Sequence, residues 1–488
     1  MLLSELFPGQ PDTEITGLAM DSRKVEPGNA FFCLKGRRTD GHQYADKAAE
    51  AGAAAVVYSE DIPTREGVCY IKVDDTEKEL NRVCDLFNGS PSHKMTMFGV
   101  TGTNGKSTTS SIISAVYSHY KPCGYMGTIA VRYGTYSRVP SLTTPNQVEV
   151  HSDLREMYEH GMEAAAMEVS SHGLVEGRVD TVDFDCAIFT NLTYDHLDYH
   201  KTMENYFEAK KLLFRHIKKS GVAVLNRDDA ASIEGLEECT ACRYVTYGTG
   251  VLGEADYMAQ DVRLTPNGTD FVLVNKGIKY PVHTNLVALY NVYNLLGAVA
   301  AMSEMGMPLE QMIPLLGSIP QVDGRMEIID EGQDFSVIVD YAHTPDGFDK
   351  IFEYADAMTK DGGNIYAVFG SAGQRDAAKR SVLGKIAGKH CRKVFVTEED
   401  PRTESAEEIG KVICGGVRES GCEAELILDR IEAINAAIRT AQKGDLVLIL
   451  GKGDESYMYY ADGRVPFIGD NAAARNALKS LAAAGRGV

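Results

Sequence analysis

The sequence predicts an α/β protein built from three domains. Short apolar runs typical of buried strands alternate with longer stretches of helical composition along the chain. The length of 488 residues corresponds to about three domains, each able to bury its own core. We therefore expect a small α/β domain over residues 1–92, a central doubly wound domain over 93–320 and a Rossmann-like domain over 321–488.

The first domain is predicted from one apolar strand and one helical stretch. Residues 30–34 form the strand, and the alanine-rich stretch at 44–57 has helical composition. A turn-forming cluster, Asn-Gly-Ser-Pro-Ser, follows at 88–92. Such clusters mark loops, so we place the boundary with the central domain there.

The two larger domains are predicted from apolar strands that alternate with helical stretches. The central strands lie at 163–169, 186–190 and 221–225, and the strands of the last domain lie at 336–340, 365–370, 393–397 and 446–451. This alternation is typical of a parallel sheet with helices on both faces. Polar or glycine residues end the last set of strands, and open sheets bind ligands at that edge. We expect the last domain to bind a ligand too.

Charge and hydropathy exclude several classes of partner. The formal net charge is −20, whereas proteins that bind nucleic acid concentrate Lys and Arg on one face. No run approaches the roughly 18 to 20 apolar residues that span a bilayer. No Lys or Arg precedes Arg23, unlike in a signal peptide. We expect no nucleic-acid partner, no membrane insertion and a cytoplasmic location.

The most informative motif is the run at 98–109, where an apolar strand ends in a glycine turn followed by one lysine and several hydroxyl residues. Such a turn presents backbone N–H groups and a helix N-terminus to phosphate oxygens. Lys106 would reach the outer phosphates, and Ser107 would hold magnesium. The form is shorter than the common P-loop, because Val100 stands where that pattern has its first glycine. The predicted ATP-binding residues of this central P-loop ATPase domain are Gly102, Thr103, Asn104, Gly105, Lys106, Ser107 and Thr108.

Two further stretches place acidic and imidazole side chains after predicted strands. Glu168 lies at the end of the strand at 163–169, and Asp195 and His196 follow the strand at 186–190. Magnesium prefers oxygen ligands and few protein contacts, so Glu168 is a candidate ligand beside Ser107. His196 or a neighbouring carboxylate could hold a second metal in a phosphoryl transfer.

A helix predicted at 206–214 carries Lys210 and Lys211 between apolar residues. Taken alone, this pattern indicates a solvated basic face.

With these pieces in order, the chain resembles the Mur ligases, the ATP-dependent amide-forming enzymes of peptidoglycan synthesis, nearly end to end. The resemblance is to the branch of the family that forms the tripeptide. The shared motifs lie at 21–23 (Asp-Ser-Arg), 36–41, 102–108, 143–144, 167–174, 191–198, 291–294, 323–325, 340–343 and 451–453.

The resemblance implies binding sites for the other substrates. The first domain would hold a uridine nucleotide through Met20, Ser22, Arg37, Arg38 and Thr39. The muramoyl dipeptide would lie along Thr143, Thr144, Ser170, Glu176 and Arg178. ATP would also be contacted by Asn294, Arg325 and Asp340.

The resemblance also reverses the interpretation of Lys210, because it matches the carbamoylated lysine of the family. Carbon dioxide adds to a neutral amine and turns a cation into a carboxylate-like ligand. The implied magnesium ligands are then Ser107, Glu168, His196 and Lys210, with Lys106, Glu168, His196 and Lys210 as the catalytic set.

The family reaction begins when ATP converts the D-glutamate carboxylate of UDP-N-acetylmuramoyl-L-alanyl-D-glutamate to an acyl phosphate. The amine of a diamino acid then attacks, and phosphate leaves. Closure of the last domain would exclude water from the acyl phosphate.

The identity of the diamino acid depends on positions where the chain departs from the family pattern. Members specific for diaminopimelate carry Asp-Asn-Pro-Arg where this chain has Glu399, Asp400, Pro401 and Arg402. Arg402 suits the second carboxylate of meso-diaminopimelate. Asp400 points instead to the bare ammonium of L-lysine.

The other end of the expected pocket keeps more of the family pattern. These members have Gly-Lys-Gly-His-Glu at the positions of Gly451 to Glu455, where this chain has aspartate in place of the histidine. Glu455 suits the distal ammonium of diaminopimelate, and Arg375 is expected on the α-carboxylate. We favour meso-diaminopimelate and keep L-lysine as the alternative.

One departure lies outside the pocket. Ala288 stands where the family usually has glycine before the Asn-x-x-Asn motif at 291–294, and we expect a tolerated packing change.

Two other classes of function share part of this pattern. A folylpolyglutamate synthase shares the phosphate loop and the modified lysine but lacks the Asp-Ser-Arg first domain. A non-catalytic Mur-ligase-like scaffold would have lost Lys106, Glu168, His196 or Lys210, and all four are present. We expect a monomeric enzyme whose partners are the UDP-MurNAc-dipeptide and a diamino acid.

Overall fold

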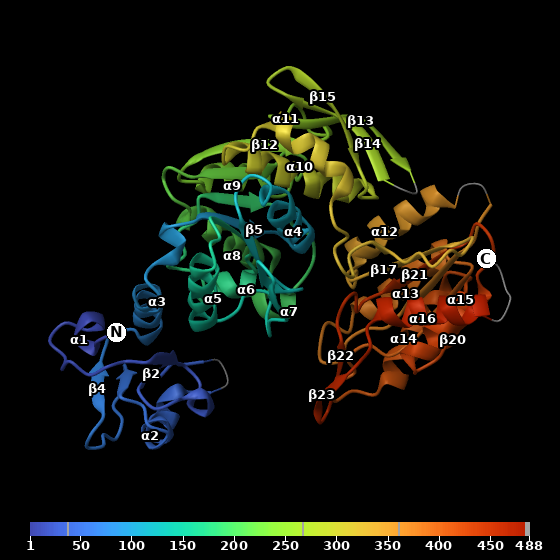
Figure 1. Ribbon diagram of the computed structural model, residues 1–488. Coiled ribbons are helices and arrows are strands. Elements are labelled where there is room, and N and C mark those ends of the chain that lie inside the picture. Colours follow the sequence, from blue (N-terminus) through green and yellow to red (C-terminus); the bar gives the residue numbers. More distant parts are fainter. Residues whose placement is uncertain (37–38, 266–267, 360–361, 484–488) are drawn as a thin grey trace.

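The computed structural model describes residues 1–36, 39–265, 268–359 and 362–483. Three α/β units follow one another along the chain, each with its own sheet (Figure 1). The predicted fold class is therefore confirmed. The sheets span residues 17–72, 96–284 and 327–450, and the expected divisions at 92/93 and 320/321 remain predictions.

The first domain has a four-stranded parallel sheet in chain order. Its strands are β1 (Gly17–Ala19), β2 (Asn29–Phe32), β3 (Ala55–Tyr58) and β4 (Cys69–Lys72), and its α-helices are α1 (Leu3–Leu6), α2 (Ala45–Glu50) and α3 (Thr76–Phe87). The stretch at 44–57 is thus α-helical only over α2, which follows a 3₁₀ turn at Gly41–Tyr44. The β-branched Val56 and Val57 favour the strand that follows.

The central domain has an eleven-stranded sheet in the order β15-β14-β13-β12-β11-β10-β5-β9-β6-β7-β8. The strands are β5 (Thr96–Thr101), β6 (Cys123–Met126), β7 (Val131–Tyr133), β8 (Tyr136–Arg138), β9 (Ala164–Glu168), β10 (Cys186–Phe189), β11 (Val222–Asn226), β12 (Arg243–Gly248), β13 (Tyr257–Thr265), β14 (Gly268–Asn275) and β15 (Ile278–Thr284). Along the central run of the sheet, β13-β12-β11-β10-β5-β9-β6, all neighbouring strands are parallel, as predicted.

Both edges of the central sheet are antiparallel, which the sequence prediction missed. β7 and β8 extend one edge, and β14 and β15 extend the other. Buried and partly exposed residues alternate along most of β14, as expected for a strand with one solvated face. An alternating pattern of this kind is a weaker sequence signal for a strand than the continuous apolar runs of the parallel strands.

Helices cover both faces of the central sheet. α4 (Lys106–Tyr117) and α10 (Leu289–Glu304) share one apolar core with the sheet, whereas α5 (Gln147–Glu159) and α8 (Met203–His216) share the other. The shorter helices are α6 (Ser171–Val175), α7 (Leu197–His200), α9 (Ile233–Cys239) and α11 (Leu309–Met312). This arrangement holds α4, which begins at the phosphate loop, against β5.

Ala288 precedes α10 in a backbone conformation that favours glycine. Its φ is 72° and its ψ is 145°, a region that costs a residue with a Cβ roughly 1–3 kcal/mol. The departure from the family's glycine is thus a matter of backbone strain, not only the packing change expected from the sequence.

We expect Ala288→Gly to stabilise the protein by about 1 kcal/mol, because the relief of strain exceeds the roughly 0.8 kcal/mol lost with one buried methyl. Urea denaturation measures the change. Ala298→Gly inside α10 is the matched control and should destabilise, since glycine costs about 1 kcal/mol in a helix interior. Equal destabilisation by both variants would contradict the assignment of strain at Ala288.

The third domain has a six-stranded sheet in the order β16-β17-β21-β18-β19-β20. Its strands are β16 (Glu327–Ile328), β17 (Ser336–Asp340), β18 (Ile365–Phe369), β19 (Lys393–Val396), β20 (Glu423–Leu426) and β21 (Leu446–Leu450), with a separate hairpin of β22 (Tyr457–Tyr460) and β23 (Gly463–Pro466). The four predicted strands coincide with β17, β18, β19 and β21. The helices are α12 (Pro345–Met358), α13 (Lys379–His390), α14 (Ala406–Glu419), α15 (Arg430–Thr440) and α16 (Asp470–Ala483).

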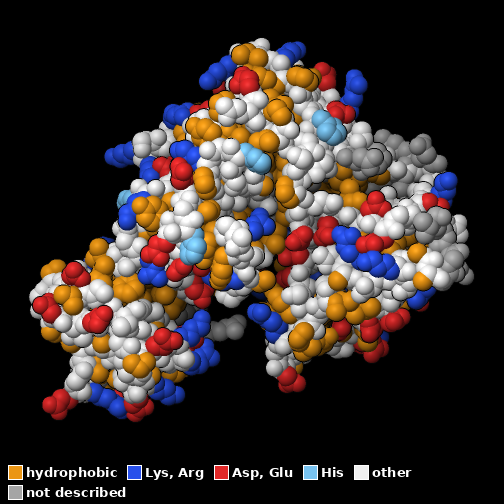
Figure 2. Space-filling view, viewed as in Figure 1, with side chains coloured by type: hydrophobic (Ala, Val, Ile, Leu, Met, Phe, Trp, Pro, Cys, Tyr) orange, Lys and Arg blue, Asp and Glu red, His pale blue; other side chains and the backbone are white. Residues whose placement is uncertain are grey.

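The central domain lies between the other two. Figure 2 shows an open gap between the first domain, at lower left, and the third domain, at right. Within the described ranges, no helix combines the length and hydropathy needed to cross a membrane.

Candidate functional site

The phosphate loop forms the tight turn that its glycines predict. Gly102 and Gly105 have φ values of 146° and 86°. A Cβ on Gly102 would lie 1.8 Å from Thr190 Oγ1, and one on Gly105 would lie 2.1 Å from Asn294 Oδ1. Only glycine fits at either position, and the loop leads directly into the N-terminus of α4.

Lys106 is folded onto this loop. Its ammonium donates to the carbonyl oxygens of Gly102 and Thr103 at 3.0 and 2.8 Å. Burial lowers the pKa of Lys106, while Glu168 and Asp195 raise it. Lys106 is therefore close to both acidic groups that the sequence analysis singled out.

Glu168 is fully buried at the end of β9 and accepts hydrogen bonds from three other residues. The Tyr125 hydroxyl and the Thr128 N–H donate to Oε1 at 2.6 and 2.9 Å. The hydroxyls of Ser107 and Thr128 donate to Oε2 at 2.9 and 3.1 Å. Ser107 and Glu168 were paired from the sequence, whereas Tyr125, within the neighbouring strand β6, and Thr128, just after it, were missed.

His196 is the residue immediately before α7 and has a φ of 53°. Its Nε2 lies 3.3 Å from Asp195 Oδ2, and its ring packs edge-on against His172. Burial lowers the pKa of His196 to about 4, although Asp195 opposes the shift. The imidazole is therefore neutral near pH 7, the form that can bind a metal.

Lys210 lies inside the molecule, so the interpretation of this helix as a solvated basic face is wrong at this position. Its side chain is 1% exposed, and Nζ donates to the Gly102 carbonyl at 2.6 Å. Burial, reinforced by Lys106, lowers the pKa of Lys210 well below its usual value. The neighbouring Lys211 instead pairs with Glu208 on the helix surface at 2.9 Å.

The donor set was compared with the needs of magnesium. Over the described residues, no group of three His, Cys, Asp or Glu side chains could hold a metal. Ser107 and Glu168 supply the oxygen atoms that magnesium prefers, and neutral His196 supplies a nitrogen. These residues fit a magnesium ion that also takes ligands from phosphate, water or a modified lysine.

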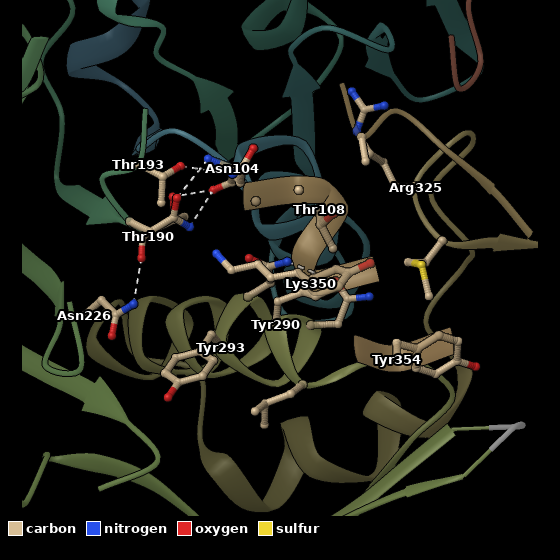
Figure 3. Close-up of a pocket in the computed structure, with 18 of the residues that line it drawn as sticks. Asn104, Thr108, Thr190, Thr193, Asn226, Tyr290, Tyr293, Arg325, Lys350 and Tyr354 are labelled. Carbon is tan, nitrogen blue, oxygen red and sulfur yellow. Dashed lines mark hydrogen bonds between the residues drawn. The ribbon is translucent and has the colours of Figure 1, made fainter. Parts of the chain in front are cut away.

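A cavity of about 620 Å³ lies where the central and third domains meet. Figure 3 shows Asn104, Thr190 and Thr193 on one side, Tyr290 and Tyr293 on α10, and Arg325 on the segment that leads into the third domain. The predicted residues that line it are Asn104, Gly105, Thr108, Asn294, Arg325 and Asp340. Gly102, Thr103, Lys106 and Ser107 are not among the lining residues.

The third domain contributes Lys350 to the lining of this cavity, and its Asp346 contacts the phosphate loop beside it; neither was predicted from the sequence. Asn104 Nδ2 of the phosphate loop donates to Asp346 Oδ2 at 2.9 Å, and Lys350 donates to the same oxygen at 2.9 Å. Both third-domain residues lie on α12, which no motif had marked. The contact joins the phosphate loop to the third domain.

Arg325 and Asp340 lie on the same side of the cavity. The Arg325 guanidinium stacks 4.2 Å from the centre of the Tyr341 ring. Asp340 accepts from the N–H groups of Met326 and Ala342, both at 2.7 Å. Burial raises the pKa of Asp340, which Arg325 opposes.

A second cavity, of about 310 Å³, adjoins the first. Tyr341 and His343 line both. The predicted residues around the second cavity are Thr143, His196, Arg375, Glu399, Asp400, Arg402, Gly451 and Glu455. Lys379, Tyr457 and Tyr459 also line it and were missed, whereas Pro401 is not among its lining residues.

The side chains of the second cavity carry both signs of charge. Arg375 lies 3.8 Å from Asp198 of the central domain. Arg402 donates to the Gly373 carbonyl at 2.6 Å and lies over the Tyr459 ring. Burial raises the pKa of Glu399.

The surroundings of Asp400 weaken the case for L-lysine that was based on its charge. Its Oδ1 lies 2.8 Å from Lys452 Nζ and accepts the Tyr459 N–H at 3.0 Å. From the sequence alone, the negative charge of Asp400 was expected to favour the bare ammonium of L-lysine. That charge is in fact opposed by a buried lysine that is distant in the sequence.

Among the described residues expected along the UDP-substrate, Thr143 alone lines one of the two cavities. Met20, Ser22 and Thr39 belong to the first domain, and Arg37 and Arg38 lie outside the described residues. The others form one network. Thr144 donates to the Glu168 carbonyl at 2.9 Å and accepts the Ser170 N–H, and Arg178 pairs with Glu176 and donates to the Thr144 carbonyl.

The chain was compared with known proteins. It matches family models described as the Mur ligase family catalytic domain (residues 14–86), the Mur ligase middle domain (100–302) and the Mur ligase glutamate ligase domain (324–453). A protein of Geobacillus kaustophilus named UDP-N-acetylmuramoyl-L-alanyl-D-glutamate–2,6-diaminopimelate ligase is 41% identical, with 96% of each chain covered. A Bacillus cereus protein of the same name is 40% identical, with 92% of each covered.

Solved structures show the same likeness. A structure titled with that ligase name aligns with a TM-score of 0.68 and 30% identity over 99% of each chain. A MurF ligase from Thermotoga maritima in complex with ADP aligns with a TM-score of 0.66 at 20% identity, covering 90% of this chain and 95% of that one. The second likeness supports the fold alone.

Proposed function

Because this chain belongs to the Mur ligase family, we propose that it is the ATP-dependent ligase that joins 2,6-diaminopimelate to UDP-N-acetylmuramoyl-L-alanyl-D-glutamate in peptidoglycan precursor synthesis. Diaminopimelate is the amino acid named for relatives that are about two-fifths identical. L-lysine remains the alternative, since Asp400 departs from the family pattern.

One observation carries the proposal: the two cavities meet at Tyr341 and His343. The phosphate loop opens onto the first cavity, and charged side chains of both signs surround the second. An acyl phosphate formed at the junction would therefore lie within reach of an amine bound on the other side. Amide formation through a phosphorylated carboxylate needs this arrangement.

In the first step, a carboxylate oxygen of D-glutamate attacks the terminal phosphorus of ATP, and ADP leaves. Lys106 and the N–H groups of the phosphate loop would neutralise charge on the transferring phosphoryl group. Magnesium held by Ser107, Glu168 and His196 would supply further positive charge there when bound. Asn294, Arg325 and Asp340 would contact the nucleotide from the opposite wall.

In the second step, the free amine of the amino acid attacks the carbonyl carbon, and inorganic phosphate leaves with the bonding electrons. The amine loses a proton as the amide forms. Arg375 would bind the α-carboxylate and Arg402 the second carboxylate, through charge-assisted hydrogen bonds. The contact between Asn104 and Asp346 would help the third domain close and exclude water.

We further propose that Lys210 is carbamoylated. Its buried amine has a lowered pKa, which favours the neutral form that adds carbon dioxide with release of a proton. The product is an anion, which would suit the space beside Lys106. It would also add an oxygen ligand to the proposed magnesium set.

The test measures ADP release with UDP-N-acetylmuramoyl-L-alanyl-D-glutamate as acceptor and meso-diaminopimelate, L-lysine or L-ornithine as the amine. We expect turnover with meso-diaminopimelate and background release when the acceptor is omitted. Turnover with lysine alone would transfer the assignment to the lysine-adding ligases. If the protein is folded but releases no ADP with any of the three amines, the non-catalytic scaffold is favoured.

A further inference from the structure

A buried cluster of three charged side chains forms one wall of the second cavity. Lys452 is 0% exposed. Its Nζ lies 2.8 Å from Asp400 Oδ1 and 2.5 Å from Glu455 Oε2. Asp400 and Glu455 line the cavity, whereas Lys452 is not among the lining residues. The cluster therefore holds two carboxylates and one cation, with the cation behind the wall.

The backbone fixes the members of this cluster. Asp400 follows β19 in the left-handed region, with a φ of 42°, and its Oδ1 also accepts the Tyr459 N–H. Lys452 follows β21 between two glycines with positive φ. Because β19 and β21 are separated only by β18, the carboxyl ends of these parallel strands bring the two residues together.

The charges of the cluster decide what the cavity can accept. With Lys452 present, the three side chains sum to one negative charge. Without it, two carboxylates would face the ligand unopposed, which favours a side chain that ends in a bare ammonium. With it, one carboxylate is left to pair with an ammonium, and Arg402 can bind a carboxylate.

Lys452 also orients Glu455. The lysine pairs with Oε2, while Oε1 lies 3.5 Å from the hydroxyls of Tyr341 and Tyr457. Both tyrosines line the cavity. A carboxylate held on one oxygen by a buried cation presents its other oxygen in a defined direction, at little further cost in side-chain entropy.

From these contacts we infer that Lys452 is a specificity-determining residue that acts through Asp400 and Glu455. It offsets the charge of Asp400, so that the cavity takes an amino acid whose far end is zwitterionic in preference to one that ends in an ammonium alone. This inference rests on the proposed function and identifies the residue that sets its choice of amino acid.

The experiment compares the ratio of kcat/KM for meso-diaminopimelate to that for L-lysine in four proteins: wild type, Lys452→Met, Asp400→Asn and the double variant. Lys452→Met should shift the ratio toward lysine by about tenfold or more. Asp400→Asn should shift it toward diaminopimelate. The double variant restores the net charge of the wild-type cluster, so its ratio should return to within about threefold of wild type.

Two results would overturn the inference: a Lys452→Met ratio equal to that of wild type, or a double variant that keeps the ratio of Lys452→Met. Lys443→Met, at an exposed lysine before β21, is the matched control and should leave the ratio unchanged. A merely structural role for Lys452 would lower both kcat/KM values together without moving their ratio.

Removal of one partner from a buried ion pair strongly destabilises a protein when the other partner stays charged. A second comparison therefore keeps the inference testable if Lys452→Met does not fold. The comparison of Asp400→Asn with the double variant then carries the test. These two proteins differ only by the loss of the Lys452 charge. Equal kcat/KM ratios in the two would contradict the inference. If wild type released ADP with neither amine, the proposed function would fail instead, and calorimetric binding of the two amino acids would supply the same ratios.

Discussion

Replacement of Lys210 by alanine is expected to lower the rate of ligation by about 10³-fold or more. The side-chain nitrogen of Lys210 lies beside the phosphate loop, 2.6 Å from the Gly102 carbonyl oxygen. Among the described residues, no carboxylate lies within ion-pair distance of Lys210. A buried lysine without a counter-ion is better explained by a neutral or modified side chain than by a structural ion pair.

The measurement is ADP release with all three substrates, repeated with added bicarbonate, which should not rescue Lys210→Ala. Lys211→Ala is the matched control, because Lys211 is the next residue on the same helix and pairs with Glu208 at the surface. A ¹³C carbonyl signal that requires Lys210 would identify the carbamate directly. Wild-type turnover by Lys210→Ala would exclude the modified lysine from the mechanism.

Replacement of Glu168 by glutamine is expected to reduce kcat/KM by about 10²- to 10³-fold. Glutamine keeps the shape of the side chain but loses the negative charge. It also places an NH₂ group where two donors now point at one oxygen, since Ser107 and Thr128 both donate to Oε2. The variant would therefore bind magnesium weakly and would disturb the Ser107 hydroxyl.

The Glu168 prediction is checked by titration of activity with magnesium, where half-maximal rate should require a higher concentration than in wild type. Glu163→Gln provides the control, because Glu163 precedes the same strand and is exposed. An unchanged magnesium requirement in Glu168→Gln would remove Glu168 from the proposed metal ligands. Loss of thermal stability alone would indicate a structural role for this buried carboxylate.

Much of the fold could be predicted from the sequence because the signals were local. The strands β17, β18, β19 and β21 are continuous apolar runs, buried on both faces, and their ends were predicted within about one residue. The antiparallel edges of the central sheet could not be predicted in this way. Their strands are partly exposed, so the apolar pattern is diluted.

In the candidate site too, contiguous motifs were predicted and residues distant in the sequence were missed. The phosphate loop was found because its glycines, lysine and hydroxyl residues are contiguous and their backbone requirements are local. Tyr125 and Thr128 were missed, although both donate to Glu168, because nothing near them in the sequence marks a site. Asp346 and Lys350 were missed for the same reason, since only the approach of α12 brings them to the phosphate loop.

The α/β class and the phosphate loop follow from the amino-acid sequence, as does the resemblance to the Mur ligases through the order of the motifs. The tertiary structure alone decided that Lys210 is buried, that two cavities meet at Tyr341 and His343, and that Asp400 is paired with Lys452. The physical reason is that turns and buried strands depend on neighbours along the chain. Burial and charge pairing depend on strand order and domain contacts, which join residues far apart in the sequence.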